Sequence, residues 1–335
     1  MALQSSGQIT FGNISNEFGL PPGKNLGGYR VSENHGSLSN LPLDNTIPQS
    51  GEIRFSDFYG RRLNVVVDCY SGGTETRANA RSKYNGNQVN VVGGFRGKPS
   101  NPSGIKVIVN VNKSFQSQKD NNQNVVALRT GEYGSNCLLR VDIGGSGYIG
   151  GAGGNGGNGN SGNGSPGQNG NSGLGIDHES SDGTTVINNS GTISAGFGGG
   201  GGGGGAFDYD KGSSRSAGGG GGGGGAGFPA GSGGSGGTSG SNGGNGSGGG
   251  LNSAGSGGGG GNNDNEAVGG SGGAGGSNGE GADGGGTGRG GEGSSSPGGS
   301  GGGDGAAIRR ESGGFTISVV GGGTVRGSTT ATGVA

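Results

Sequence analysis

The sequence has little from which a large hydrophobic core could be built. It contains no tryptophan, and hydrophobic and aromatic residues make up only 24% and 5% of its 335 positions. Soluble globular proteins are about 45–50% apolar. This shortage excludes an ordinary globular enzyme over the whole length of the chain.

Residues that carry charge or chemistry are scarce as well. Lys and Arg number 21 against 22 Asp and Glu and form no basic block, so binding to nucleic acid has no electrostatic basis. The two histidines, His35 and His178, belong to no catalytic Ser/His/Asp or Cys/His set, so we expect no enzymatic activity and no cofactor. Cys69 and Cys137 form neither a disulfide framework nor a zinc pattern. We interpret them as core residues and leave open whether they pair.

Glycine is abundant and unevenly distributed. Residues 1–143 contain 18 of the 101 glycines, and residues 144–335 contain the other 83. The composition therefore changes near Gly144, and it predicts three parts: a segment over 1–60, a small β module over 61–143 and a glycine-rich part over 144–335. No apolar stretch approaches the roughly 18 residues of a membrane span, so we expect no membrane insertion.

A short repeat opens the chain. Residues 6–14, SGQITFGNI, are echoed by residues 50–58, SGEIRFSDF. Apolar and polar residues alternate in both copies, which is the period of a half-buried extended segment, and Ser15-Asn16 or Ser56-Asp57 could cap a short helical turn. Too little here is apolar for a self-sufficient domain, so we interpret residues 1–60 as a docking segment rather than a tail. Its candidate contact residues are Ile9, Phe11, Phe18, Ile53, Phe55, Phe58 and Tyr59.

The same repeat resembles the opening module of many virion proteins of tailed bacteriophages. The resemblance covers residues 4–60, and each copy is followed by an aromatic residue and a glycine, Phe18-Gly19 and Tyr59-Gly60. It implies location in the virion and attachment to other virion proteins. It implies no particular activity.

Strand patterns follow the repeat. Apolar residues alternate with polar ones, and β-branched residues dominate, over residues 63–70, 88–92, 105–111, 124–128 and 137–143. Glycine, asparagine, serine and proline fill the gaps between these segments. We expect a mainly β fold with few or no α-helices. Residues 61–143 should form a small β-sandwich-like module, or an antiparallel sheet packed on the next region, that leans on its neighbours.

Two uninterrupted runs of eight glycines, Gly198 to Gly205 and Gly218 to Gly225, mark the last part. A flexible linker is the default for such a composition. Collagen is excluded because glycine does not occupy every third position and proline is rare. The third arrangement is a bundle of polyglycine-II helices, whose backbones bond to one another laterally because only glycine allows so close an approach. We favour this bundle, since compact non-glycine stretches punctuate the runs as turns would.

The glycine-rich part resembles the receptor-binding adhesins at the tips of long tail fibres in T-even-like bacteriophages. The resemblance is carried by Ile187-Asn188-Asn189-Ser190-Gly191-Thr192-Ile193, the two glycine runs, and the closing Ala307-Ile308 and Phe315-Thr316-Ile317. It implies that loops between the glycine runs contact the outer surface of the host, either a glycan or an outer-membrane protein. Fibre proteins are often trimeric, so we expect a homotrimer or attachment to a trimeric fibre.

Candidate receptor-binding residues come from the richest loops, because aromatic residues and arginine are common binding anchors. They are Phe207, Asp208, Tyr209, Asp210, Lys211, Arg215, Phe228, Leu251, Asn263, Asp264 and Glu266. The aromatic residues could instead cover the edge of the bundle. No metal is expected at Asp264, since the calcium-binding nonapeptide repeat is absent.

Two other functions are alternatives to the adhesin. One is a purely structural virion component, such as a neck, capsid or tail-tip fibre that reads no receptor. The other is an ice-binding bundle, which is disfavoured because threonine is sparse and irregular over residues 195–305.

Overall fold

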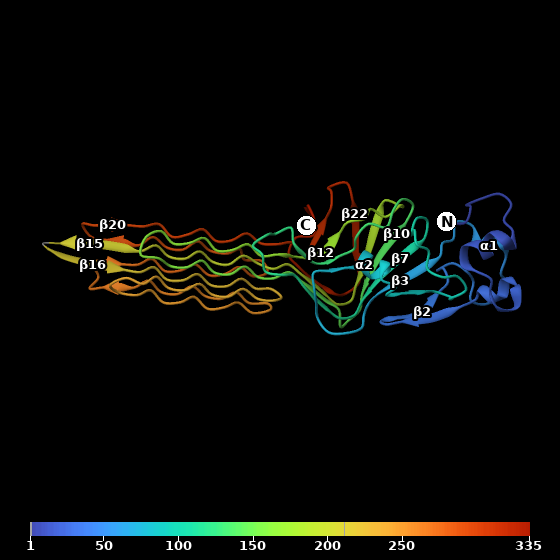
Figure 1. The fold of residues 1–335 in the computed structure, drawn as a ribbon, viewed down its shortest axis with the longest axis horizontal. Coiled ribbons are helices and arrows are strands. Elements are labelled where there is room, and N and C mark those ends of the chain that lie inside the picture. Colours follow the sequence, from blue (N-terminus) through green and yellow to red (C-terminus); the bar gives the residue numbers. More distant parts are fainter. Residues whose placement is uncertain (1, 211) are drawn as a thin grey trace.

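The structure is a computed structural model that describes residues 2–210 and 212–335. The molecule is elongated, with the N-terminal segment at one end, stacked strands in the middle and glycine-rich segments running to the opposite end (Figure 1). In the part of the chain that the structure describes, two segments are α-helical, α1 (Phe11–Phe18) and α2 (Ala80–Asn85). The expected mainly β fold is therefore confirmed.

The middle part is a parallel β-solenoid in which the chain coils repeatedly past three sheets. Their strand orders are β22-β13-β10-β7-β3-β6, β23-β14-β11-β8-β4 and β24-β21-β12-β9-β5. Each coil adds one strand to the first sheet, one to the second and one to the third, in that order. Strands of successive coils are parallel, whereas β6 pairs antiparallel with β3.

The first sheet consists of β3 (Asn64–Cys69), β6 (Val89–Val91), β7 (Lys106–Val111), β10 (Leu138–Ile143), β13 (Thr184–Asn189) and β22 (Thr316–Val320). The second consists of β4 (Glu75–Thr76), β8 (Ser114–Gln116), β11 (Tyr148–Gly150), β14 (Thr192–Ser194) and β23 (Thr324–Arg326). The third consists of β5 (Ala78–Asn79), β9 (Val126–Arg129), β12 (Ser172–Ile176), β21 (Ile308–Arg310) and β24 (Ala331–Thr332).

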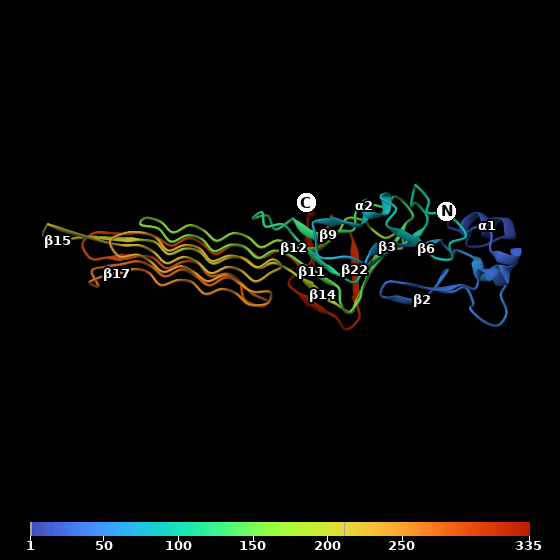
Figure 2. The same cartoon turned by 60° about the horizontal axis from the view of Figure 1, so that its bottom comes forward.

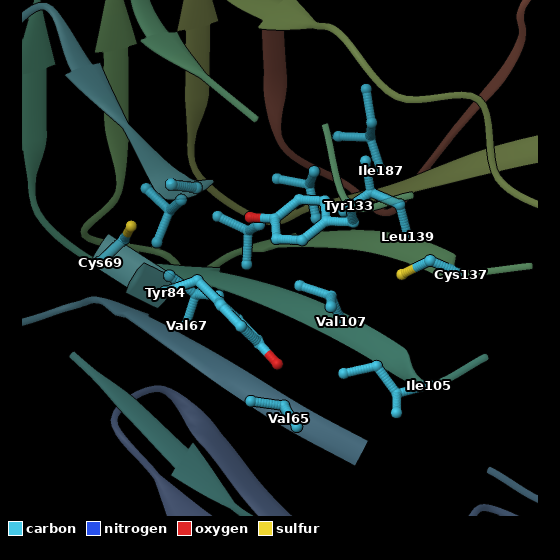
Figure 3. Close-up of a cluster of buried hydrophobic side chains, with 14 of the residues drawn as sticks. Val65, Val67, Cys69, Tyr84, Ile105, Val107, Tyr133, Cys137, Leu139 and Ile187 are labelled. Carbon is cyan, nitrogen blue, oxygen red and sulfur yellow. The ribbon is translucent and has the colours of Figure 1, made fainter. Parts of the chain in front are cut away.

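Apolar side chains stack from coil to coil inside the solenoid, and Figure 3 shows part of this core. Val67, Val109, Val141 and Ile187 share one register position across four strands of the first sheet, and all four are fully buried. The same position on the last coil is Val319, which is exposed. The stack buries apolar surface without large side chains, which explains how a sequence poor in aromatic residues forms a core.

The predicted strand segments contain β3, β6, β7 and β10 and overlap β9, which continues to Arg129, but the predicted β-sandwich over 61–143 is wrong. The sheets are largely parallel, and they continue past residue 143 through strands as late as β24. Alternation of apolar and polar residues shows which face of a strand is buried, but it does not show which strand lies beside it. Parallel neighbours are joined by long crossover connections, which here include the glycine-rich part itself.

Cys69 and Cys137 are free and buried in this core, as Figure 3 shows. Burial raises the pKa of both thiols to about 12. The interpretation of both as core residues is confirmed, and the question of their pairing is answered by two free thiols.

Both glycine-rich excursions leave the solenoid between its second and third sheets. Residues 151–171 connect β11 to β12, and residues 195–307 connect β14 to β21. Within them, extended segments run alternately away from the solenoid and back (Figures 1 and 2). We call the end beside the solenoid the base of the bundle. The distal tip is the far end, formed by residues 206–210, 212–217, 262–268 and 289–295.

Hydrogen bonds between these segments repeat every third residue. In the run Gly198–Gly205, the N–H groups of Gly199, Gly202 and Gly205 donate to Gln168, Ser165 and Gly162 of one neighbouring segment. Those of Gly200 and Gly203 donate to Gly223 and Gly220 of a second segment, and those of Gly201 and Gly204 to Asp283 and Gly286 of a third. A period of three residues and lateral bonds to neighbouring segments are features of packed polyglycine-II helices.

The two uninterrupted glycine runs lie inside the bundle, where neighbours surround them. A Cβ atom added to Gly199 would lie 2.1 Å from the carbonyl oxygen of Asn155. One added to Gly200 would lie 2.1 Å from that of Gly273, and one added to Gly201 would lie 2.0 Å from that of Gly299. Since real Cβ atoms do not approach so closely, no position of the turn accepts another residue.

Segments at the edge of the bundle have one face free, and there every third residue can carry a side chain. Asn155 and Asn158 occupy such positions in one edge segment. Their side-chain oxygens accept hydrogen bonds from the N–H groups of Ser232 at 2.9 Å and Ser235 at 3.0 Å. These amides thus take the place of a further backbone segment and satisfy donors at the edge.

The N-terminal segment contains α1, three 3₁₀ helices and a hairpin. They are η1 (Pro22–Lys24), η2 (Leu26–Tyr29), η3 (Phe55–Phe58), β1 (Ser32–His35) and β2 (Leu38–Pro42). In each copy of the repeat, the helix that follows begins with the same kind of N-terminal cap. Asn13 accepts a hydrogen bond from the N–H of Thr10 at 2.9 Å, and Asp57 accepts one from the N–H of Arg54 at 2.7 Å.

The extended conformation expected for the repeat therefore ends at Phe11 and Phe55, which begin α1 and η3. The caps are Thr10 and Arg54, not the serines at positions 15 and 56. The side chain three positions after each cap satisfies a backbone donor that the helix leaves free, and this local bond outweighs the alternating pattern.

Candidate functional site

The distal tip combines two small antiparallel sheets. One contains β15 (Ala206–Asp210), β16 (Ser213–Ala217) and β20 (Ser294–Ser295), and the other contains β17 (Asn262–Asn263), β18 (Ala267–Val268) and β19 (Arg289–Gly290). β15 extends furthest from the solenoid (Figures 1 and 2). Because β19 and β20 belong to one loop, residues 289–295 join the two sheets.

Because alternate residues of a strand point to opposite faces, Phe207 and Tyr209 lie on one face of β15 and Asp208 lies on the other. Phe207 and Tyr209 are 40% and 59% exposed, whereas Asp208 between them is only 4% exposed. Serines lie opposite both aromatic residues on β16, Ser216 opposite Phe207 and Ser214 opposite Tyr209. Such small side chains leave the two aromatic rings uncovered on one face of the hairpin.

Charged residues at the tip are engaged with one another and with the backbone. The Asp208 carboxylate accepts a hydrogen bond of 2.7 Å from the N–H of Glu292. Arg215, on β16, forms an ion pair with Glu266 and lies 3.8 Å from the carboxylate of Asp264. A hollow of about 160 Å³ lies among them, lined by Asp208, Asp210, Ser213, Arg215 and Glu266.

The tip thus brings together most of the candidate receptor-binding residues. Phe207, Asp208, Tyr209, Asp210 and Arg215 lie on its first hairpin, and Asn263, Asp264 and Glu266 lie on or between β17 and β18. Lys211 lies outside the described residues. Residues 290–295 also belong to the tip, but they are glycines, serines and Glu292, and nothing in the sequence distinguishes them from an ordinary turn.

Phe228 and Leu251 lie at the base, away from the tip. The Phe228 ring packs against Tyr148 of the solenoid with ring centroids 5.2 Å apart. Leu251 is exposed beside Asn252, whose side chain accepts a hydrogen bond from Arg326 of β23. Successive segments run in opposite directions, so every second turn returns to the base.

Among residues 2–210 and 212–335, no group of three or more His, Cys, Asp or Glu side chains is placed to hold a metal ion. His178 is a core residue: burial lowers the pKa of its imidazole from the ordinary value of 6.5. Its Nδ1 accepts a hydrogen bond of 3.4 Å from the N–H of Tyr133, and its Nε2 lies 3.3 Å from the carbonyl oxygen of Cys137. No helix in the described ranges is long and apolar enough to cross a membrane.

The candidate docking residues at the opposite end differ in exposure. Phe18 and Phe58 are fully buried, and Tyr29 packs against both, so these two phenylalanines build the segment and present no surface. Phe55 is 42% exposed. The remaining candidates are half-buried: Ile9, Phe11, Ile53 and Tyr59. A hollow of about 410 Å³ nearby is lined by Ala2, Leu3, Gln4, Asn13, Asn16, Glu17 and Arg96.

Comparison with known proteins yields one similar solved structure to report. No protein-family model matches the chain, and no curated protein matches it. The chain is similar to the crystal structure of the gp37–gp38 adhesin tip complex of the bacteriophage S16 long tail fibre. The two are 20% identical, the match covers 97% of this chain and 99% of the other, and the TM-score is 0.38.

Proposed function

We propose that this chain is a bacteriophage tail-fibre adhesin that attaches to the virion by its N-terminal segment and binds a host-surface receptor with its distal tip. One observation carries the proposal: β15, which bears the exposed Phe207 and Tyr209, lies at the end of the molecule opposite the N-terminal segment (Figure 1). An attachment end and a recognition end, separated by a long body, are what an adhesin requires.

The bundle suits the role of a spacer. A run of eight residues in an extended helix with about 3.1 Å rise per residue spans roughly 25 Å. Hydrogen bonds to three neighbours hold each interior segment, so forces at the tip act on a connected network. In this proposal the bundle fixes the distance and orientation of the tip, and loops at its end contact the receptor.

The partners in this proposal are other virion proteins at one end and a glycan or outer-membrane protein of the host at the other. The chain acts as a homotrimer or on a trimeric fibre, and it binds without catalysing a reaction. Phe55 and Leu20 are exposed apolar residues of the N-terminal segment, and they are the surface we assign to the virion contact.

Binding of the fluorescently labelled protein to host cells tests the receptor assignment. In one variant, residues 207–216 are replaced by glycine and serine at equal length. In the matched control, residues 251–253 at the base are replaced in the same way. We expect the tip variant to lose binding and the base variant to bind like the original chain.

Equal binding by both variants would reject the tip as the receptor site. If the unaltered chain does not bind host cells, yet electron microscopy finds it on the particle, the purely structural virion role replaces the adhesin.

A further inference from the structure

Residues of β15 point alternately to two sides, and the two sides meet different surroundings. Phe207 and Tyr209 point to the exposed face, where serines lie opposite them. Asp208 points to the other side and is buried against the loop 289–295, where it accepts the hydrogen bond from Glu292. We infer that Phe207 and Tyr209 are the contact residues of the tip, and that Asp208 and Arg215 are positioning residues that hold its three loops as one body. This inference rests on the proposed function and assigns separate roles within its site.

The loop 289–295 is paired with β18 and β15 at its two ends, and its middle lies against Asp208. It passes so close to β15 that a Cβ atom at Gly293 would meet the carbonyl oxygen of Phe207 at 1.9 Å, and one at Gly290 would meet it at 2.3 Å. Gly291, between them, lies against the Asp208 carboxylate, and a Cβ atom there would meet its Oδ1 at 2.9 Å. Glycines let the loop approach, and the buried carboxylate supplies the acceptor that fixes it.

A second set of bonds ties the hairpin 262–268 to the same body. The N–H of Gly291 donates to the carbonyl oxygen of Glu266 at 3.1 Å. The Glu266 side chain pairs with Arg215 of β16, and the side chain of Asn263 donates to the carbonyl oxygen of Ser216 at 3.4 Å. Arg215 is therefore engaged by a neighbouring loop, whereas the two aromatic residues have exposed side chains.

Pre-organisation explains why charged residues of a binding tip should bond to neighbouring loops and not to the receptor. Loops that are ordered before binding lose less conformational entropy when the receptor binds. Two aromatic side chains held on one face of a strand present large, stiff surfaces with few rotatable bonds.

The test compares amide hydrogen exchange with binding to host cells in the full chain. Asp208→Ala removes the acceptor for Glu292, and we expect exchange over residues 289–295 to rise and binding to fall by about tenfold or more, since a buried bond to a charged group is lost. Asp208→Asn retains an acceptor oxygen and should keep most of both properties. Phe207→Ser with Tyr209→Ser should abolish binding and leave exchange unchanged. Slow exchange over Gly198–Gly205 confirms that each variant is folded.

A charge reversal separates positioning from contact for Arg215. Arg215→Glu and Glu266→Arg should each weaken binding and speed exchange over residues 262–268. The double variant should restore much of both, because the pair is rebuilt in reverse, although residue 215 then faces the Asp264 carboxylate. A double variant that restores slow exchange without binding would make Arg215 a contact residue and overturn its assignment. If amide exchange over residues 289–295 is unchanged in Asp208→Ala, the assignment of Asp208 as a positioning residue is overturned. If the unaltered chain binds no cells, the proposed function fails, while the exchange results still decide the positioning roles.

Discussion

Phe18, which follows the first copy of the N-terminal repeat, and Phe58, which ends the second, lie edge to face with ring centroids 6.2 Å apart. Both rings are fully buried, and Tyr29 packs against each of them. The repeat therefore folds onto itself, and its most apolar residues stabilise the segment. The docking role is left to the few side chains that stay on the surface.

Truncation of one of these rings should destabilise the chain. We expect Phe58→Ala to lower the free energy of unfolding of the N-terminal segment by about 3–5 kcal/mol, because it leaves a cavity in a packed cluster. Chemical denaturation followed by tyrosine fluorescence measures the change. Phe55→Ala, at an exposed position, is the control and should alter the free energy by less than about 0.5 kcal/mol. Equal effects of the two substitutions would contradict the packing described here.

The exposed Phe55 offers a test of virion attachment that does not disturb folding. Phe55→Asp places a charge on the proposed contact surface, so we expect less of the variant in purified particles, with the isolated protein as stable as the original. Immunoblotting of particles measures incorporation. Leu251→Asp, at an exposed position in the base, serves as the control and should be incorporated normally. Normal incorporation of Phe55→Asp would move the attachment surface elsewhere.

Glycine inside the bundle should tolerate no side chain. A Cβ atom at Gly201 would lie 2.0 Å from the carbonyl oxygen of Gly299, so Gly201→Ala must push two segments apart. Each buried donor or acceptor left unpaired costs about 1–3 kcal/mol, and we expect a clear fall in melting temperature with faster amide exchange around the site. Gly259→Ala, where nothing lies within 4 Å of the added atom, should leave both nearly unchanged. Similar melting of the two variants would argue against a close-packed bundle.

Stability should depend on pH through His178. Burial lowers the pKa of its imidazole in the folded state, so the unfolded chain binds the proton more readily. The contribution of His178 is therefore fully present above about pH 6.5 and is lost as the pH falls toward its lower folded-state pKa. Melting temperatures between pH 8 and pH 5 measure the effect. A His178→Gln variant should show a shallower decline over that window, and an identical decline would assign the pH dependence to other groups.

The two thiols should resist modification until the solenoid opens. Their pKa values of about 12 leave almost no thiolate at pH 8, and both sulfur atoms are buried. With a thiol-reactive dye we expect almost no reaction in buffer and reaction of both cysteines in denaturant. Rapid labelling of Cys69 or Cys137 in buffer would show that the core opens readily.

Local patterns in the sequence predicted much of the fold. Strands such as β7 and β10 followed from alternating β-branched residues, because a half-buried strand needs that period wherever its partner lies. The capping of α1 was missed because alternation at Ile9 and Phe11 resembles a strand, whereas the deciding bond joins Thr10 to Asn13. For the site, the loop around Phe207 was selected from its composition, but its β-hairpin was not predicted, and the loop 289–295 has no composition that distinguishes it from a turn.

By itself, the sequence determined where backbones can touch: only glycine permits contact on all three faces of an extended helix, so within a bundle the unbroken runs Gly198–Gly205 and Gly218–Gly225 are the segments that neighbours can surround. Only the tertiary structure decided which turns of the bundle lie together at the distal tip and which lie at the base. Phe207 and Phe228 flank neighbouring segments yet lie at opposite ends of the bundle, since direction alternates from one segment to the next. It also decided that the strands pair in parallel coils, because pairing partners are set by chain connections that no local pattern records.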